Sequence, residues 1–553
     1  MKPKRTDELT SREREILSPY VSDVRASVFA LRNLNPEVIG AALARYSRAP
    51  TGFKETVARE FLNPDGTPNE VKGTELIDRV VNKFGDESVA ELAVASLCIE
   101  EVSNLMTKVI EDCRIGGSPI EESTRYVLYD EKKNGRWRYV RPRSVVESGL
   151  GKKFINTMDF LFETYAGLVE PMQDLFRKRL PGDRFAIEVE RNGKILNACL
   201  ADLENENERK VHRIAYNFTI RSAACDVIRC ILPACTMANL GLVGNGRFYT
   251  GLISKLMTQE LREGHGLAAE IRDALNTQIP TFIKRAGKNR YREEIHRNMK
   301  TLCSGLFQGI PIDKAAEVVL LEDREADYPL NLIASMIFPY VQHPTAQIRR
   351  VVRGLPEEKR REIFHTCIGN RENKRDRPGR ALEYGYPIHF DIIAGFAEYR
   401  DLQRHRMLTQ QRQNLGVLIG YSVPEEIGEI GKDEVVQECF DRCEDLHADL
   451  KRAGMEEEAQ YATLFNHFIR WNVGMNLREL GHMTELRSQK AGHPKYRRTV
   501  QTMARLYLKR YPEFEPILKF VDYNDYDQSV TRATQEARTA RKSLATGVFD
   551  DMD

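Results

Sequence analysis

Arg404, His405 and Arg406 stand side by side in the segment QRHRMLTQQRQN, which covers residues 403–414. Their donors point in different directions, and guanidinium groups hold phosphate oxygens through paired, charge-assisted hydrogen bonds. The preceding residues, 389–404, have the spacing of an amphipathic helix, whose C-terminal end favours cations. Taken alone, such a cluster is more typical of a solvated basic helix end. A phosphate site is therefore a hypothesis that depends on its context.

A second polar segment, EESTRY, brings Glu121, Ser123, Arg125 and Tyr126 close together in the sequence. By itself this segment is typical of a polar loop that enters a strand, because surface loops carry polar residues. Its combination of hydroxyl and guanidinium donors is nevertheless suited to an anion.

Helical spacing of apolar residues dominates the chain. It predicts helices over 91–113, 207–231, 312–322, 389–404, 433–453 and 497–510. Enrichment in β-branched and aromatic residues favours strands at 125–129, 136–140 and 185–189. The predicted fold class is therefore helix-rich α+β, with a loop at 371–380 and a loose tail at 547–553.

The chain also contains a weak internal repeat, whose two copies are here called the first and the second pass. Similar segments occur in the same order in both passes. The pairs of similar segments are 28–50 with 332–355, 87–103 with 379–396, and NGR at 245–247 with NLR at 476–478. This order predicts two tandem domains, at residues 1–285 and 331–553, joined by a connector at 286–330.

Composition limits the functions that the chain can have. Its 553 residues suffice for at least two domains. The 83 basic and 81 acidic residues give a net charge of +2, so no global field favours DNA, RNA or a membrane surface. Ten scattered cysteines without CxxC spacing predict reduced thiols. Because no stretch of about 18 apolar residues occurs, we expect a cytoplasmic protein.

In this context the basic cluster resembles the signature of the flavin-dependent thymidylate synthases. The family has Arg-His-Arg followed after seven residues by Ser, and Arg404, His405 and Arg406 fit the first half of that signature. The second half departs from it, because Arg412 and Asn414 stand where the family has Glu and Ser. The second pass therefore resembles the flavin-binding part of the signature alone.

The first pass has the opposite pattern. Glu111, Asp112 and Cys113 stand where the family has Arg-His-Arg, and we expect these acids to repel phosphate. The EESTRY segment, in contrast, matches the family's Glu-x-Ser-x-Arg-Tyr loop, allowing one inserted residue. In the family this loop holds deoxyuridylate.

Further residues extend the resemblance in both passes. As substrate-binding residues it implies Glu121, Ser123, Arg125, Arg229 and Arg487. As flavin-binding residues it implies Arg404, His405, Arg406, Ser88, Glu91, Asn245, Arg247, Asn476, Arg478 and His482. Arg487 corresponds to the arginine that polarises the pyrimidine, which makes it the expected catalytic residue. Gln460 replaces the phosphate arginine in the second pass, and Asp401 replaces a family glutamine.

The resemblance implies reductive methylation of dUMP to dTMP, with methylenetetrahydrofolate as the one-carbon donor and FAD, reduced by NADPH, as the hydride source. Family members are homotetramers with sites between subunits, so a two-pass chain is expected to form a homodimer that acts as a pseudo-tetramer. The complementary losses predict one composite flavin and nucleotide site per chain. Two alternatives stay open: a paralogue that binds flavin or nucleotide without catalysis, and a scaffold protein. No metal site is predicted, because the histidines lack ligand spacing.

Overall fold

The computed structural model confirms a helix-rich α+β chain. It describes residues 9–47, 49–83, 88–321, 328–369, 381, 388–512, 515, 518–526 and 528–546. The predicted loop at 371–380 and the tail at 547–553 lie outside these residues. No helix in the described part of the chain is both long and apolar enough to span a bilayer.

The chain divides into two compact units, which do not coincide with the two passes. The first unit contains residues 1–102, 106–121 and 239–293. The second unit contains residues 103–105, 122–238 and 294–553. The middle of the first pass therefore belongs to the second unit. That residues 286–330 connect two tandem domains stays a prediction from the sequence.

A three-stranded sheet with the order β1-β5-β2 characterises the first unit. Its strands are β1 (Val94–Ser103), β5 (Met237–Asn245) and β2 (Gly117–Glu121), and β2 runs antiparallel to β5. The helices that belong to this unit are α1 (Ser11–Leu17), α2 (Pro36–Tyr46), α3 (Phe53–Thr56), α4 (Glu70–Ile77), α5 (Asn104–Glu111), α9 (Gly246–Thr258), α10 (Arg262–Leu275) and α11 (Pro280–Ile283).

The helix predicted over 91–113 is wrong over most of its length, because β1 takes up its first part and only α5 is helical. Ala95, Leu97 and Ile99 are buried while the residues between them are exposed. This alternation has the period of a strand, and pairing with β5 stabilises it. Apolar residues spaced closely enough to fit both periods cannot be assigned from the sequence alone.

The second unit contains a four-stranded antiparallel sheet with the order β6-β7-β9-β8. Its strands are β6 (Val318–Leu321), β7 (Ile388–Gly395), β9 (Phe468–Met475) and β8 (Thr409–Arg412). The helices predicted at 312–322 and 389–404 are therefore wrong, except that the short α16 (Phe396–Leu402) follows β7. Nearly every residue of β7 and β9 is buried, and a strand buried on both faces has no distinctive period.

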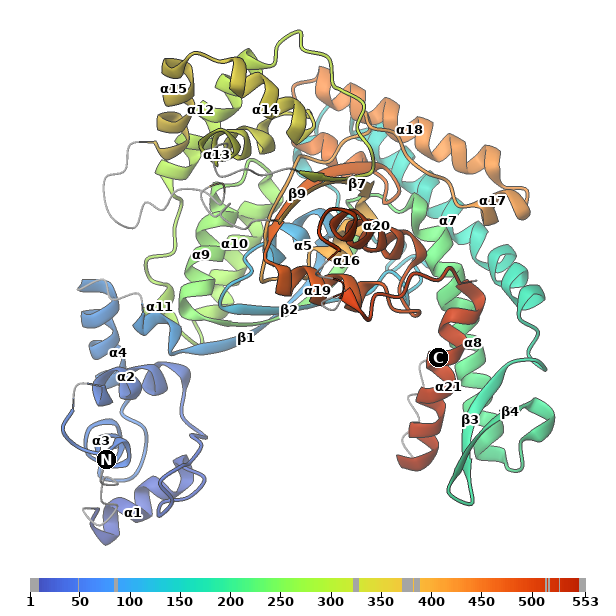
Figure 1. Cartoon of the computed structure of the whole chain (residues 1–553). Coiled ribbons are helices and arrows are strands. Elements are labelled where there is room, and N and C mark those ends of the chain that lie inside the picture. Colours follow the sequence, from blue (N-terminus) through green and yellow to red (C-terminus); the bar gives the residue numbers. More distant parts are fainter. Residues whose placement is uncertain are drawn as a thin grey trace. The chain divides into compact units, whose positions relative to one another are not determined.

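Three long helices confirm the predictions for 207–231, 433–453 and 497–510, and one of them, α20, packs against β6 and β7. The helices of the second unit are α6 (Arg143–Val146), α7 (Gly151–Arg179), α8 (Glu206–Ile228), α12 (Arg290–Leu306), α13 (Tyr328–Ile337), α14 (Thr345–Gly354), α15 (Glu357–Ile368), α17 (Glu425–Glu429), α18 (Asp433–Arg452), α19 (Leu477–Arg487), α20 (Pro494–Arg510) and α21 (Gln528–Thr546). In Figure 1, α12 to α15 form one helical group, and α21 lies along α8 beside a hairpin.

That hairpin consists of β3 (Ala186–Arg191) and β4 (Lys194–Cys199), which confirms the strand predicted at 185–189. The strands predicted at 125–129 and 136–140 are wrong. Tyr126 and Val127 instead turn back, and their amides donate to the carbonyl of Ser123 at 3.0 Å each. Residues 136–140 make only isolated bridges.

The two passes repeat one order of elements. The first runs β1, α5, β2, α8, β5, α9, and the second runs β7, α16, β8, α18, β9, α19. In each sheet the strand that follows the long helix lies between the other two, as β5 and β9 do. The first pass differs by an insertion between β2 and α8, which contains α6, α7, β3 and β4. The corresponding segment between β8 and α18 holds only the short α17.

Within the second unit, the two passes meet at equivalent positions. Pro233 and Leu464 pair as an antiparallel bridge, and each lies between the long helix and the central strand of its own pass. The amide of Ala234 donates to Thr463 at 2.8 Å, and the amide of Phe465 donates to Leu232 at 2.9 Å. Such reciprocal bonding is the property of an isologous interface, here formed inside one chain.

Lysines pair with the acids at the end of α5, where the family has Arg-His-Arg, and the expectation that this end repels phosphate stays a prediction. Lys108 is fully buried and forms ion pairs with Glu111 and, at 2.8 Å, with Glu121. Asp112 forms an ion pair with Lys255 at 2.9 Å. The flavin position of the first pass is therefore filled by internal ion pairs.

Replacing Lys108 by Met tests this ion-pair network. The substitution removes the cation that pairs with two buried carboxylates, so we expect a loss of about 3–5 kcal/mol in the free energy of unfolding. Chemical denaturation followed by circular dichroism measures it. The control is Lys288→Ala, which removes a half-exposed pair with Glu293 and should cost less than about 1 kcal/mol. Equal losses in the two variants would contradict the network.

Candidate functional site

Arg125 is held in the interior of the second unit. Its Nε and Nη2 each donate to the Asp226 carboxylate at 2.8 Å, and its Nη1 lies 3.4 Å from the Tyr496 hydroxyl. Burial opposes the positive charge, but Asp226 outweighs burial and raises the pKa of Arg125 well above its usual value. Arg125 is therefore a fixed cation that joins the first pass, through α8, to α20 of the second.

Arg229 lies directly after α8 and carries a buried guanidinium nitrogen, Nη2. It is 3% exposed, and its Nη2 is buried without a hydrogen-bond partner among the residues that the structure describes. A buried guanidinium donor left in this state is costly unless an acceptor arrives. This atom is the clearest indication of an anion site in the described chain.

His493 shows that the two arginines converge. Its ring Nε2 lies 3.4 Å from the carbonyl oxygen of Asp226. Burial, followed by the charges of Arg229 and of Arg125, lowers the pKa of His493 well below its ordinary value. Arg125 and His493 both contact Asp226, which lies three residues before Arg229, so the two predicted arginines lie close to this histidine.

Helix α16 of the second pass contacts the same loop of the first pass. Arg400 donates from Nη1 to the Thr124 hydroxyl at 3.0 Å, and it is buried. Ser123 accepts a bond from the amide of Arg125 at 3.3 Å. The EESTRY loop of the first pass therefore rests on the helix that leads to the Arg-His-Arg cluster of the second pass.

His405 lies at the centre of a second polar chain. Its Nδ1 is 2.8 Å from Glu479 Oε1, and Arg487 donates from Nε to His405 Nε2 at 3.1 Å. Since Nε2 accepts, the proton of the neutral ring is on Nδ1. Burial lowers the pKa of His405, although Glu479 opposes the shift. The hydrogen bonds from His405 to Glu479 and from Arg487 to His405 thus position the predicted catalytic Arg487 through a neutral imidazole.

Arg404 and Arg406 flank this histidine and are exposed. They lie beyond α16, which has only seven residues and ends at Leu402, so the expectation that they end a long helix is wrong. Their surface position, on either side of a buried ring, still suits contact with a polyanionic ligand.

The remaining flavin residues of the second pass lie on or next to α19. Asn476 caps the helix by accepting from the Glu479 amide at 3.0 Å. Arg478 and His482 are exposed, and the His482 ring lies 5.5 Å from that of His405. The structure therefore groups His482 with the Arg-His-Arg cluster and gives Asn476 a capping role.

The corresponding residues of the first pass lie in the first unit. Asn245 caps α9 by accepting from the Phe248 amide at 2.8 Å. Arg247 forms an ion pair with Glu91, and Ser88 is exposed at the preceding turn. Any ligand contact of these residues stays a prediction.

Glu121 is placed differently from its prediction as a substrate-binding residue. Thr107 donates to its Oε1 at 2.8 Å and Lys108 donates to its Oε2 at 2.8 Å. Its side chain is 1% exposed. Because both oxygens are already used in the interior, Glu121 is a structural residue.

The equivalent loop of the second pass lacks the cations of the first. Glu457, which corresponds to Asp226, accepts from Asn414 at 3.2 Å, from Gln460 at 2.9 Å and from Lys300 at 3.3 Å. Gly416 stands where the first pass has Arg125. A cavity of about 200 Å³ adjoins these residues, but a glycine and an amide, Gly416 and Gln460, stand there in place of the two arginines.

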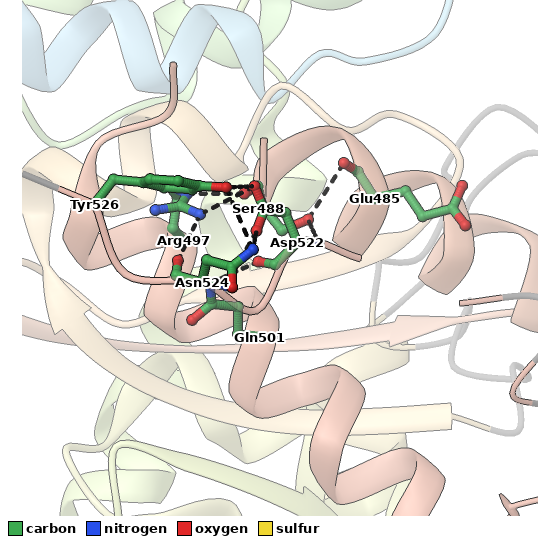
Figure 2. Close-up of polar contacts among 7 residues, drawn as sticks. All are labelled: Glu485, Ser488, Arg497, Gln501, Asp522, Asn524 and Tyr526. Atoms are coloured by element: carbon green, nitrogen blue, oxygen red, sulfur yellow. Dashed lines mark hydrogen bonds and ion pairs between the residues drawn. The ribbon is translucent and has the colours of Figure 1, made fainter. Parts of the chain in front are cut away.

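The end of α19 is fixed by a segment that follows α20, drawn in Figure 2. Arg497 is 2% exposed and donates from Nε to the Ser488 carbonyl at 2.7 Å and from Nη2 to the Asn524 carbonyl at 3.0 Å. The amide of Asp522 donates to the Ser488 hydroxyl at 3.0 Å. Since Ser488 directly follows Arg487, this network orients the predicted catalytic residue.

Several functional residues had no signal of their own in the sequence. Asp226, Arg400, Glu479, His493 and Tyr496 lie in or next to helices with many other polar residues, and no motif marks them. The one available signal was their placement on the buried side of otherwise amphipathic helices. In the described part of the chain, no group of three or more His, Cys, Asp or Glu side chains could hold a metal ion.

Sequence comparison identifies the class of protein. The family model described as thymidylate synthase complementing protein matches residues 31–281 and 359–513, which is well over half of the chain. The chain therefore belongs to this family, and the resemblance inferred from its motifs is confirmed.

Full-length relatives include a UPF0159 protein of Chlamydia muridarum, 33% identical over 549 residues, which cover 96% of this chain and 98% of the relative. A UPF0159 protein of Thermoplasma acidophilum is 30% identical over 491 residues, covering 88% of this chain and 96% of the relative. A solved flavin-dependent thymidylate synthase from Helicobacter pylori, complexed with FAD and dUMP, is 18% identical. Its match covers 46% of this chain and 96% of its own, with a TM-score of 0.24.

Replacing Arg497 by Ala tests the support of α19. We expect amide hydrogen exchange in residues 518–526 to become about 10- to 100-fold faster, because a buried carbonyl loses its partner at a cost of about 1–3 kcal/mol. Mass spectrometry of peptides from this segment measures the exchange. Arg505→Ala is the control, since Arg505 is exposed and stacks on Tyr523 of the same segment. Similar exchange in both variants would refute the role of Arg497.

The protonation of His405 gives a pH-dependent prediction. Because its pKa is lowered from the ordinary 6.5, the ring should stay neutral, with the proton on Nδ1, until the pH falls clearly below that value. Imidazole nitrogen shifts in selectively labelled protein report both states, and His405→Gln identifies the signal. In Glu479→Gln the pKa should fall further, since Glu479 favours the charged ring. Protonation at or above pH 6.5 would exclude this arrangement.

Proposed function

We propose that the protein is an FAD-dependent thymidylate synthase-like enzyme that methylates dUMP reductively, using methylenetetrahydrofolate and NADPH. The observation that supports the proposal is that the first-pass loop contacts helices of the second pass within one unit. Thr124 and Arg125 contact Arg400 and Tyr496. These contacts support the proposal that the complementary halves of the motif form one composite site.

The nucleotide phosphate would be held by the first pass. Arg229 offers the buried Nη2 that lacks a partner among the described residues, and a phosphate oxygen is the acceptor that suits it. The charge of Arg125 is balanced by Asp226, so Arg229 supplies the additional positive charge. Ser123 adds a hydroxyl donor beside them.

The flavin would be held by the second pass. Arg404 and Arg406 suit its phosphates, because they are exposed cations on either side of a fixed imidazole. Bound FAD would supply the hydride that the methylation requires. Arg487, oriented by His405, would polarise the pyrimidine carbonyl, since a preorganised guanidinium stabilises developing negative charge.

The proposal includes a homodimer. The reciprocal pairing of Pro233 with Leu464 already provides one dimer-like interface within the chain. The family members that the motifs resemble are homotetramers with sites between subunits, so two such chains would make the equivalent assembly. We further propose one flavin and one nucleotide per chain, since the second loop has lost its arginines.

A second candidate function is binding without catalysis. It is favoured by the loss of charge in the second loop, where Asn414 and Gln460 take the places of a serine and an arginine. In this case the protein would bind flavin or dUMP but would not release the hydrogen from C5 of the uracil.

Release of tritium from dUMP labelled at C5 separates the two candidates. The assay uses the purified chain with FAD, NADPH and methylenetetrahydrofolate. Tritium release that depends on all three supports the enzyme. Flavin colour and nucleotide binding without tritium release support the binding protein, and absence of both rejects the two together.

Replacing the proposed phosphate-binding arginine of the first pass by the residue found in the second pass tests the composite site. Arg229→Gln gives the first pass the residue of the second and should weaken dUMP binding by about 1.5–3 kcal/mol, the value of a charge-assisted hydrogen bond. Calorimetry measures the affinity. The matched control is Gln460→Ala at the equivalent position, which should leave dUMP affinity unchanged. An affinity insensitive to Arg229→Gln would remove this residue from the site.

A further inference from the structure

A hollow on the second unit lies apart from all residues assigned above. Its volume is about 550 Å³, and all of its walls come from residues 132–159. These residues belong to the insertion between β2 and α8, which has no counterpart in the second pass. The hollow is therefore a feature of this insertion and not of the repeated site.

Arg141 is fixed in the wall of this hollow. Its Nη1 donates to the carbonyls of Trp137 at 3.3 Å and Tyr139 at 3.1 Å, and its guanidinium lies 3.8 Å from the centre of the Tyr139 ring. It forms no ion pair with a carboxylate in the described part of the chain. A guanidinium held by carbonyls and a ring keeps its full charge and needs little ordering to bind a ligand.

The rim of the hollow is also preorganised. Lys133 and Arg136 exchange backbone hydrogen bonds at 2.9 and 3.0 Å around Asn134 and Gly135, whose φ angles are 51° and 75°. Positive φ at both central residues defines a type I′ turn, a tight and well-defined connection. The turn therefore holds Lys132 and Arg136 at the mouth of the hollow.

Among the residues that the structure describes, no carboxylate forms an ion pair with Arg136 or Arg141, while Lys132 forms an exposed ion pair with Glu163 at 3.7 Å. Asp159 accepts a hydrogen bond from the Tyr139 hydroxyl at 2.8 Å. Glu147 pairs with Arg143 on the exposed edge. Four cationic side chains line the hollow against two acidic ones, so its net charge is positive.

We propose that this hollow binds a small polyvalent oxyanion, through Arg141 in the wall and Lys132 and Arg136 at the rim. Three separated cations match a ligand with two or more adjacent charged groups, which are phosphates or carboxylates. A ligand with one charge could not engage the wall and the rim together. The site is independent of the nucleotide and flavin residues of the proposed enzyme.

Titration of the full chain with pyrophosphate and with citrate tests the site and separates the two ligand classes. Calorimetry gives the affinity, and fluorescence gives the location. The chain has two tryptophans. Trp137 lines the hollow, and Trp471 is fully buried in β9. The binding signal in fluorescence should therefore disappear in Trp137→Phe.

Arg141→Gln should weaken binding of the preferred anion at least 10-fold, and Arg136→Gln should weaken it several-fold. Arg136 is exposed, so its replacement keeps the test valid if Arg141→Gln fails to fold. Arg177→Gln is the control, because it removes an exposed arginine from α7 in the same insertion. Tighter binding of pyrophosphate assigns phosphate, and tighter binding of citrate assigns carboxylate.

Two results would overturn the proposal. One is the absence of saturable binding by either anion. The other is binding that survives Arg141→Gln and Arg136→Gln but is lost in Arg229→Gln, which would place the anion at the nucleotide loop. Failure of tritium release leaves this test unaffected, because the titration requires neither FAD nor dUMP.

Discussion

The antiparallel pairing of Pro233 with Leu464 is the contact on which the second unit depends. Each residue lies between a long helix and the central strand of its pass, so the pairing joins the segment after α8 to the segment before β9. Arg400 of α16 contacts the first-pass loop in the same unit. Between separate subunits such an isologous contact occurs at a symmetry axis. On a single chain the two sides can differ, and here they do.

The difference between the two loops has a simple electrostatic form. Both retain a carboxylate at the end of the long helix, Asp226 in the first pass and Glu457 in the second. Asp226 is balanced by Arg125, and Arg229 remains as surplus charge. Glu457 has neutral amides and one half-exposed lysine, Lys300. At an effective dielectric constant of about 20, two charges 4 Å apart interact by about 4 kcal/mol. Without the two arginines, the negative charge of Glu457 makes the second loop less favourable for a dianion than the first.

The sequence predicted the fold class, the long helices and the order of the repeat, because long amphipathic segments have an unambiguous period. It failed at β1 and β7, where apolar runs lead directly into short helices and fit both periods. The choice between helix and strand there depends on β5 and β9, which are distant in the sequence. Local spacing therefore could not predict these strands.

The same limit applies to the site. Motifs predicted Arg125, Arg229, Arg404 and His405, because each has a fixed spacing within its own segment. Their partners could not be predicted in this way, since Asp226 and Tyr496 are 101 and 371 residues from Arg125. Glu121 was assigned to the ligand because its motif position was right, but Lys108 draws its carboxylate into the interior.

The Lys108 network supports the proposal of one flavin per chain. In the second pass, α16 leads to two exposed arginines around a buried histidine. In the first pass, the equivalent helix ends in acids, and Lys108 and Lys255 are already paired with them. Lys108 could serve a phosphate only by giving up its ion pair with the buried Glu111. Because breaking a buried ion pair costs several kcal/mol, this position of the first pass is poorly suited to an anion.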